Sequence, residues 1–175
     1  MKVTHIIPEH IASTLDAFRE IGCKVNVGAD WAEVDARQQE LKPMSLMTLP
    51  FPGFPTDMQA PFMATLLSIP GNSLVQDTVY NDRFKHVAEL ERLGASIQLN
   101  GNTATIKGGL PLEGADIMGS DLRASAALVL AGLIAEGETT ISRIYHLDRG
   151  YEDFEAKMAK IGATVKRFNP DARDE

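Results

Sequence analysis

Residues 84–106, FKHVAELERLGASIQLNGNTATI, contain a helix pattern, a glycine and two strand patterns in immediate succession. Apolar residues recur every three or four positions over 84–93, which predicts an amphipathic helix. Gly94 follows at the point where helices commonly end on a left-handed residue. Residues 100–102, Asn-Gly-Asn, separate two segments of alternating polarity and predict a tight hairpin. The stretch therefore predicts a helix that leads into two antiparallel strands.

The same helix, glycine and strand pattern occurs three times along the chain. Its copies are residues 10–27, 84–99 and 151–168, with the helix-ending glycines at positions 22, 94 and 162. After the first copy, a turn sequence precedes a second strand pattern at 31–34, which predicts another hairpin. The third copy has a strand pattern but ends before its hairpin return. We interpret the chain as an array of repeated units.

A second shared block precedes the helices of the later two copies. Residues 55–84 and 119–150 each run from a hydroxyl residue and an aspartate through an apolar helix to a glycine, a strand and Asp-Arg. Residues 124–135 are apolar on every side, so we expect this helix to lie inside the protein. The pattern predicts an α/β (α+β) fold of βαβαββ units, with the apolar helices packed together and the sheets outside.

These patterns divide the chain into a partial unit (1–40), a full unit (41–107), a final unit (108–168) and a frayed tail (169–175). The first unit lacks its apolar-helix half, so about two and a half units are expected and the chain looks truncated. We expect the missing half to leave an exposed apolar face and an open sheet edge. Such a surface favours self-association or binding of a partner lobe.

Composition limits the classes of function. The 175 residues are 44% hydrophobic and carry a net charge of −7, so there is no basic excess to bind the nucleic-acid backbone. Cys23 is the sole cysteine, which excludes an internal disulfide, and the four histidines lack metal-ligand spacing. No apolar run approaches the roughly 20 residues that span a bilayer. We expect a cytoplasmic protein without nucleic-acid or membrane partners.

Asp57 and Asp121 occupy equivalent positions in the two shared blocks, directly after Thr56 and Ser120. One interpretation is structural, because a hydroxyl cap and a first-turn carboxylate stabilise the start of a helix. The other is catalytic, because a partly buried carboxylate beside a loop can accept a proton from a substrate hydroxyl. The local sequence supports both.

Three arginines also fall at distinctive places. Arg83 and Arg149 complete the Asp-Arg pairs, and Arg123 lies two residues into an apolar helix. A guanidinium in such surroundings requires an anionic partner. That partner could be one of the nearby aspartates or a bound carboxylate or phosphate, which forked guanidinium groups grip well. Cys23, by contrast, is expected to pack within the scaffold.

Four segments together resemble the C-terminal lobe of the UDP-N-acetylglucosamine enolpyruvyl transferases, also called UDP-N-acetylglucosamine 1-carboxyvinyltransferases. They are PGFPTDMQA (52–60), VYNDRFKHVAELERLGA (79–95), SDLRASAALVLAGLIAEG (120–137) and RIYHLDRGYEDFEAKMAKIGA (143–163). The resemblance implies a lobe folded as an inside-out α/β barrel, which a complete member builds from three βαβαββ units. It also implies transfer of the enolpyruvyl group of phosphoenolpyruvate to UDP-N-acetylglucosamine in peptidoglycan synthesis, without a metal or organic cofactor.

The resemblance further implies roles for six residues. Asp57 is similar to the carboxylate that takes the proton of the sugar 3′-hydroxyl, and Asp121 to an acid near the reacting carbon. The backbone of Val79 is similar to one that holds the UDP-sugar. The three arginines resemble the cationic cluster that faces phosphoenolpyruvate and the intermediate, and Arg149 is also expected to take part in catalysis. They are Arg83, Arg123 and Arg149.

Members of this family are more than twice as long, and their other lobe supplies a Lys-Asn pair, further arginines and a loop cysteine. Cys23 does not match that cysteine. We therefore expect this chain alone to be inactive and to need an N-terminal lobe in cis or in trans. Two alternatives stay open: a lobe of a shikimate-3-phosphate enolpyruvyl transferase, and a non-catalytic module that binds a UDP-sugar or a partner lobe.

Overall fold

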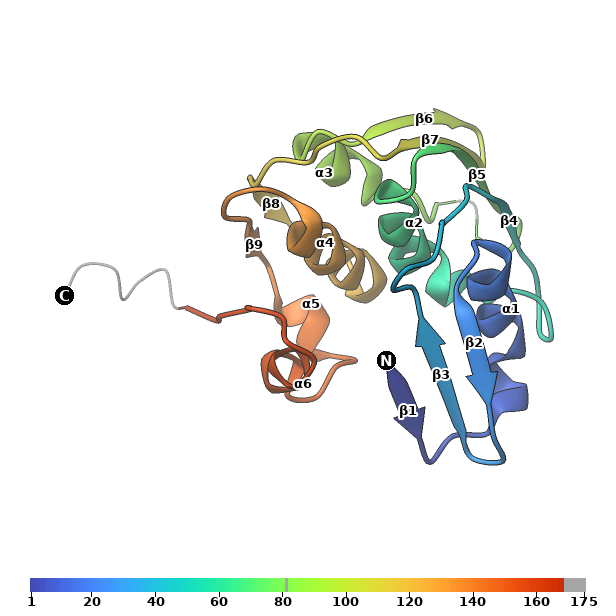
Figure 1. Ribbon diagram of the computed structural model, residues 1–175. Coiled ribbons are helices and arrows are strands. Elements are labelled where there is room, and N and C mark those ends of the chain that lie inside the picture. The colour runs from blue at the N-terminus through green and yellow to red at the C-terminus, as the bar shows by residue number, and fades with distance from the viewer. Residues whose placement is uncertain (81, 169–175) are drawn as a thin grey trace.

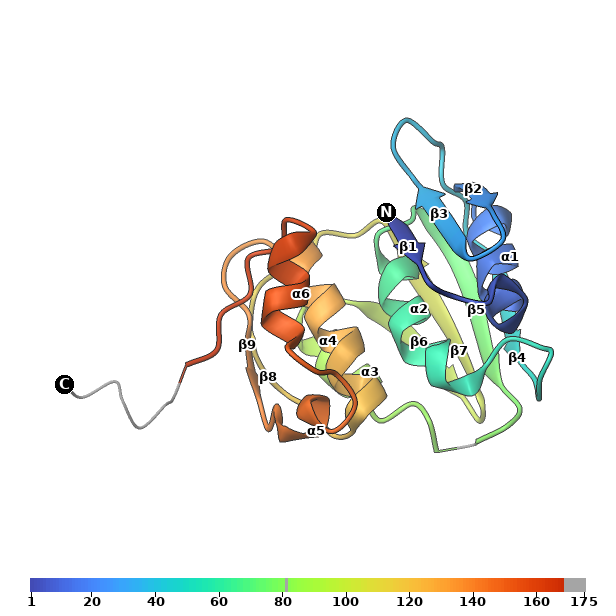
Figure 2. The same cartoon turned by 90° about the horizontal axis from the view of Figure 1, so that it is seen from below.

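The computed structural model describes residues 1–80 and 82–168, and the tail predicted to fray, 169–175, lies outside them. Three sheets follow one another along the chain, and helices α2 (Gln59–Leu67) and α4 (Leu122–Ile134) lie side by side between them (Figure 1). The turned view in Figure 2 shows the same two helices adjacent and roughly aligned. The expected arrangement, with inner helices together and sheets outside, is confirmed.

The first sheet has three antiparallel strands in the order β1-β3-β2. Its elements are β1 (Lys2–Thr4), η1 (Pro8–Ile11), α1 (Ala12–Glu20), β2 (Lys24–Val27) and β3 (Trp31–Asp35). Strands β2 and β3 form the predicted hairpin, with Val25 opposite Val34. Between α1 and β2, Gly22 has a φ of 100°, and a Cβ there would lie 2.9 Å from the Glu40 carbonyl oxygen. Only glycine fits this turn without strain.

The second sheet has four strands in the order β4-β5-β7-β6. Its elements are β4 (Ser45–Thr48), η2 (Thr56–Met58), α2, β5 (Gly71–Asp77), α3 (Val87–Arg92), β6 (Ser96–Asn100) and β7 (Thr103–Gly108). Strands β4 and β5 are parallel, and the β6–β7 hairpin is antiparallel, as predicted from residues 84–106. Gly94 has a φ of 92° where α3 turns toward β6. This segment is a complete βαβαββ unit.

The third sheet consists of two short parallel strands, β8 (Asp116–Met118) and β9 (Thr140–Ser142). Helix α4 joins them, and α5 (Tyr145–Asp148) and α6 (Phe154–Lys160) follow. The strand predicted after Gly162 is wrong, because residues 163–168 pair with no strand of the described chain. A strand needs a neighbour for its backbone groups. Arg167 instead binds Asp148 and Glu155.

Helices α2 and α4 form the centre of the core. Phe62, Met63, Leu66 and Leu128 are almost completely buried there. The expectation that α4 is buried on every side is wrong for its last turn, where Leu133 and Ile134 are exposed.

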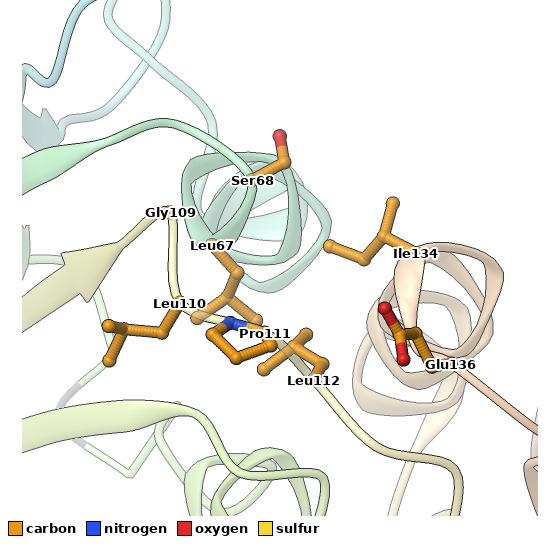
Figure 3. Close-up of a pocket in the computed structure, with 8 residues that line it drawn as sticks. All are labelled: Leu67, Ser68, Gly109, Leu110, Pro111, Leu112, Ile134 and Glu136. Carbon is orange, nitrogen blue, oxygen red and sulfur yellow. The ribbon is translucent and has the colours of Figure 1, made fainter.

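This turn borders a cavity of about 370 Å³ that lies where α2 and α4 both end (Figure 3). Leu67, Leu110, Leu112 and Ile134 make its wall largely apolar, and Glu136 is the one charged residue of its lining. It lacks the paired cationic groups that an anion would require.

Candidate active site

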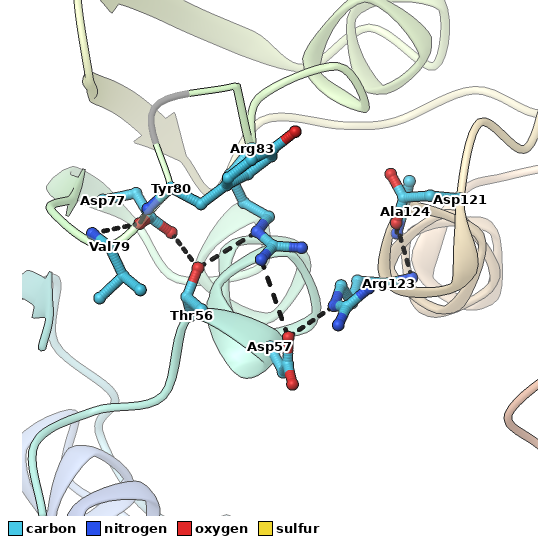
Figure 4. A network of polar contacts seen from close by, with 9 residues as sticks. All are labelled: Thr56, Asp57, Asp77, Val79, Tyr80, Arg83, Asp121, Arg123 and Ala124. Carbon is cyan, nitrogen blue, oxygen red and sulfur yellow. Dashed lines mark hydrogen bonds and ion pairs between the residues drawn. The ribbon is translucent and has the colours of Figure 1, made fainter. Parts of the chain in front are cut away.

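Four of the predicted site residues gather at the opposite, N-terminal ends of α2 and α4 (Figure 4): Asp57, Arg83, Asp121 and Arg123. Turn η2 brings Thr56 and Asp57, and the start of α4 brings Asp121 and Arg123. Arg83 lies in the loop after β5, and its side chain points toward Asp57. The site therefore depends on the packing of α2 against α4, which joins residues from two successive units.

Asp57 is the centre of this cluster. The Nε of Arg123 donates a hydrogen bond to Asp57 Oδ1 at 2.6 Å, and Arg83 Nη2 lies 3.8 Å from the same oxygen. The Asp57 side chain is 61% exposed, whereas that of Arg83 is 14% exposed. The hydrogen bond from Arg123 to Asp57 raises the pKa of that guanidinium. The proposed ion pair between these arginines and an aspartate is thus confirmed, and the pair faces solvent, where a ligand can compete for it.

Asp121 differs from Asp57 despite the matching sequence context. Its Oδ1 accepts hydrogen bonds from the backbone N–H groups of Arg123 at 2.9 Å and Ala124 at 3.1 Å, so it caps α4. Burial alone would raise the pKa of Asp121, but these two hydrogen bonds and the charge of Arg123 lower it below its ordinary value. The structural interpretation holds for Asp121. Asp57 makes no such cap, since neither η2 nor α2 has a side-chain cap.

Arg149 belongs to a neighbouring part of the site. It follows α5 directly and lines a cavity of about 310 Å³ together with Asp121, Arg123 and His146. Among the described residues it forms no ion pair with Asp57. Arg123 connects the two parts, because it binds Asp57 and also lines this cavity. The three predicted arginines therefore occupy one continuous region with Asp57 at one side.

Val79 lies in the loop after β5, and its side chain is exposed. Its backbone N–H donates to Asp77 Oδ1 at 3.0 Å, so that group is already engaged within the protein.

Sequence reasoning missed Thr56, Asp77 and Tyr80 as parts of the site. No sequence signal marks Asp77, because residues 71–77 do not alternate in polarity and the burial of positions 73, 75 and 77 appears only in the structure. The sequence pattern around Thr56 predicts only a helix cap.

Residues outside the cluster are consistent with a scaffold. Cys23 is buried, and burial raises the pKa of its thiol. Within residues 1–80 and 82–168, no group of three or more His, Cys, Asp or Glu side chains could hold a metal ion. Over the same residues, no helix is both long and apolar enough to cross a membrane.

Sheets packed around two inner helices, with guanidinium and carboxylate groups at the helix N-termini, define an α/β lobe. Residues 1–158 match the family described as EPSP synthase (3-phosphoshikimate 1-carboxyvinyltransferase), and the chain belongs to this family. The predicted fold class is confirmed, as is the resemblance to the UDP-N-acetylglucosamine 1-carboxyvinyltransferases, a name that relatives of the chain carry.

Relatives in this family carry a more specific name. The chain is 49% identical over 169 residues to the UDP-N-acetylglucosamine 1-carboxyvinyltransferase of Acinetobacter baylyi, covering 97% of this chain and 40% of that protein. It is 52% identical over 163 residues to the Synechocystis protein of the same name, covering 93% and 37%. The chain thus spans about two fifths of the length of these curated relatives.

Solved structures agree on the fold. The enolpyruvyl transferase NikO from Streptomyces tendae superimposes with a TM-score of 0.85 at 28% identity, covering 94% of this chain and 39% of that chain. An EPSP synthase from Acinetobacter baumannii gives a TM-score of 0.66 at 20% identity, covering 90% and 37%. The latter similarity concerns the fold alone.

Proposed function

We propose that the chain forms one lobe of an enzyme that transfers the enolpyruvyl group of phosphoenolpyruvate to the 3′-hydroxyl of UDP-N-acetylglucosamine. The observation that carries this proposal is the exposed Asp57 carboxylate, with Arg123 at 2.6 Å and Arg83 at 3.8 Å from one of its oxygens. A carboxylate and clustered guanidinium groups are what a reaction between a hydroxyl and an anionic enol phosphate requires. The names of relatives at 49% and 52% identity favour the UDP-sugar as acceptor.

In the proposed reaction, Asp57 accepts the proton of the sugar hydroxyl. The hydroxyl oxygen then bonds to C2 of phosphoenolpyruvate while C3 gains a proton from an acid that the other lobe would supply, which gives a tetrahedral intermediate. A C3 proton then returns to that group, and phosphate departs from C2 with the proton held by Asp57, which restores the double bond. Arg83, Arg123 and Arg149 would bind the phosphate and carboxylate groups throughout, and Asp121 lies beside them at the start of α4.

The ion pairs suggest how Asp57 becomes available as a base. Without ligand, Asp57 is the anion that Arg123 binds. A phosphate or carboxylate that reaches Arg123 and Arg83 would replace Asp57 as their partner. The displaced carboxylate is then free to accept a hydrogen bond from the sugar hydroxyl.

The proposal includes a second lobe, because this chain spans only about two fifths of its relatives' length. Closure of two lobes over the substrates would supply the orientation and water exclusion that one open lobe lacks. We expect negligible phosphate release from the chain alone, and recovery on mixing with an N-terminal lobe. Self-association through exposed apolar residues, such as Leu133 and Ile134, is the competing way to cover this lobe. A cytoplasmic location and roles in peptidoglycan synthesis, cell shape and division would follow from the reaction.

Calorimetric titration tests the ligand class. UDP-N-acetylglucosamine should bind more tightly than shikimate 3-phosphate, and Arg123→Lys should weaken binding of phosphoenolpyruvate about tenfold by removing the forked contact. Arg92→Lys is the matched control, because Arg92 ends α3 and donates to the backbone carbonyl of Asp116 in β8, outside the site. Preference for shikimate 3-phosphate would favour the alternative transferase. Equal affinities for Arg123→Lys and Arg92→Lys would contradict the proposed anion site.

A further inference from the structure

We propose that Asp77 is a positioning residue of this site, because its carboxylate orients the Arg83 guanidinium through the Thr56 hydroxyl and holds the backbone of residues 79–80. The proposal rests on the proposed function only for the identity of the ligand that Arg83 receives. Asp77 itself touches no open part of the site, since its exposed fraction is 0%.

The Asp77 carboxylate ends strand β5 and is surrounded by donors. Thr56 Oγ1 donates to Asp77 Oδ2 at 2.6 Å, and the N–H groups of Val79 and Tyr80 donate to Oδ1 at 3.0 and 2.8 Å. A buried carboxylate is tolerated where such bonds replace its water. Burial raises the pKa of Asp77, but these hydrogen bonds lower it overall, so Asp77 stays ionised at neutral pH.

The direction of the Thr56 hydroxyl follows from its neighbours. An ionised carboxylate only accepts hydrogen bonds and a guanidinium only donates them. The hydroxyl proton therefore points to Asp77, and an oxygen lone pair faces Arg83 Nε at 3.1 Å. With Nε engaged in this way, the Nη2 of Arg83 is turned toward Asp57 at 3.8 Å.

Asp77 also holds the residue whose ring covers one face of the Arg83 guanidinium. The Tyr80 ring lies 4.8 Å from the central carbon of the Arg83 guanidinium, and the Tyr80 N–H is the one bound by Asp77. Asp77 is in turn fixed by its main chain, since its N–H donates to the Asn102 carbonyl and its carbonyl accepts from the Asn102 side chain, both at 2.9 Å. The anchored Asp77 carboxylate thus positions both groups that contact the Arg83 guanidinium: the Thr56 hydroxyl at its Nε edge and the Tyr80 ring on its face.

We call the path from Asp77 through the Thr56 hydroxyl to Arg83 Nε the relay. Nuclear magnetic resonance of the intact chain tests this relay without requiring activity. The Arg83 Nε–Hε signal is assigned by its loss in Arg83→Lys, and its hydrogen exchange is measured. Thr56→Val should speed that exchange at least about tenfold, because the acceptor is gone. Thr56→Ser, which keeps the hydroxyl, should restore slow exchange. Thr65→Val is the matched control, because the Thr65 hydroxyl bonds only within α2, to the Pro61 carbonyl.

Asp77→Asn probes the origin of the relay. The amide nitrogen would donate to Thr56, which releases the hydroxyl proton from its fixed direction, so Arg83 exchange should accelerate as in Thr56→Val. The double variant should exchange no faster than Thr56→Val, since both changes break one path. Unchanged Arg83 exchange in Thr56→Val would overturn the proposal, and additive effects in the double variant would do the same. If Asp77→Asn fails to fold, the Thr56→Val and Thr56→Ser pair decides.

Titration with inorganic phosphate separates this inference from the proposed function. If Arg83 is an anion ligand that Asp77 positions, Thr56→Val should weaken phosphate binding in parallel with the faster exchange. Faster exchange with unchanged phosphate affinity would support the relay and refute the ligand role of Arg83. Weaker phosphate binding with unchanged exchange would refute the relay and leave the anion site standing.

Discussion

Substituting His86 by glutamine should remove much of the loss of stability that we expect on acidification from about pH 6.5 to about pH 4. His86 directly precedes α3 and is 1% exposed, with its ring 6.4 Å from that of Phe84. Its Nε2 has no hydrogen-bond partner within the described part of the chain. A proton added there would create a buried charge without an acceptor. Burial accordingly lowers the pKa of His86 to about 4.

The sign and size of the effect follow from this pKa. Below about pH 6.5 the unfolded chain binds a proton at His86 that the folded chain does not bind, so acid favours unfolding. The interval from 6.5 to about 4, at about 1.4 kcal/mol for each pH unit, corresponds to about 3 kcal/mol. Asp77 and Asp121 affect the free energy of unfolding at lower pH values than His86 does. Their pKa values are lowered by folding, so their contribution is lost only as the pH falls through those lowered values.

Urea unfolding at a series of pH values measures directly how the free energy of unfolding changes with pH. The wild-type chain should lose about 3 kcal/mol more than His86→Gln between neutral pH and about pH 4. His10→Gln, at an exposed position, is the matched control for loss of one histidine. If the free energy of unfolding of His86→Gln falls with pH as steeply as that of the wild type, the assignment of this acid sensitivity to His86 is refuted.

Three further substitutions test the fold, with urea midpoints as the common measurement. Leu128→Ala should cost about 2–5 kcal/mol, because Leu128 is fully buried in α4, and a cost below about 1 kcal/mol would contradict its place in the core. Gly94→Ala should cost about 1–2 kcal/mol from its φ of 92° alone, since the nearest atom to an added Cβ is 3.6 Å away. Asp121→Ala should lose about 1 kcal/mol at neutral pH while Asp121→Asn keeps most of it; equal losses would argue against a capping role.

The repeat pattern could be recognised from the sequence because each unit is specified locally. Gly22 and Gly94 adopt left-handed backbone conformations where two helices end, and the turn at 100–102 joins β6 to β7 as the alternating pattern predicts. The strand expected at 163–168 failed for a different reason. Its alternation is real, but pairing depends on a neighbour that no local pattern can guarantee.

The site could be predicted as a set of residues but not as a set of contacts. Thr56-Asp57 and Ser120-Asp121 look equivalent in sequence, yet they are placed differently relative to the helix start. Asp121 is the N-cap of α4, whereas Asp57 lies inside the turn η2 and projects away from the backbone. This offset leaves Asp57 free to meet Arg123, which is 66 positions further along the chain. The meeting depends on α2 packing against α4, so it is fixed by the core between two units and not by either motif alone. Chemistry that depends on Asp57 should therefore be sensitive to substitutions deep in that core, which touch no ligand.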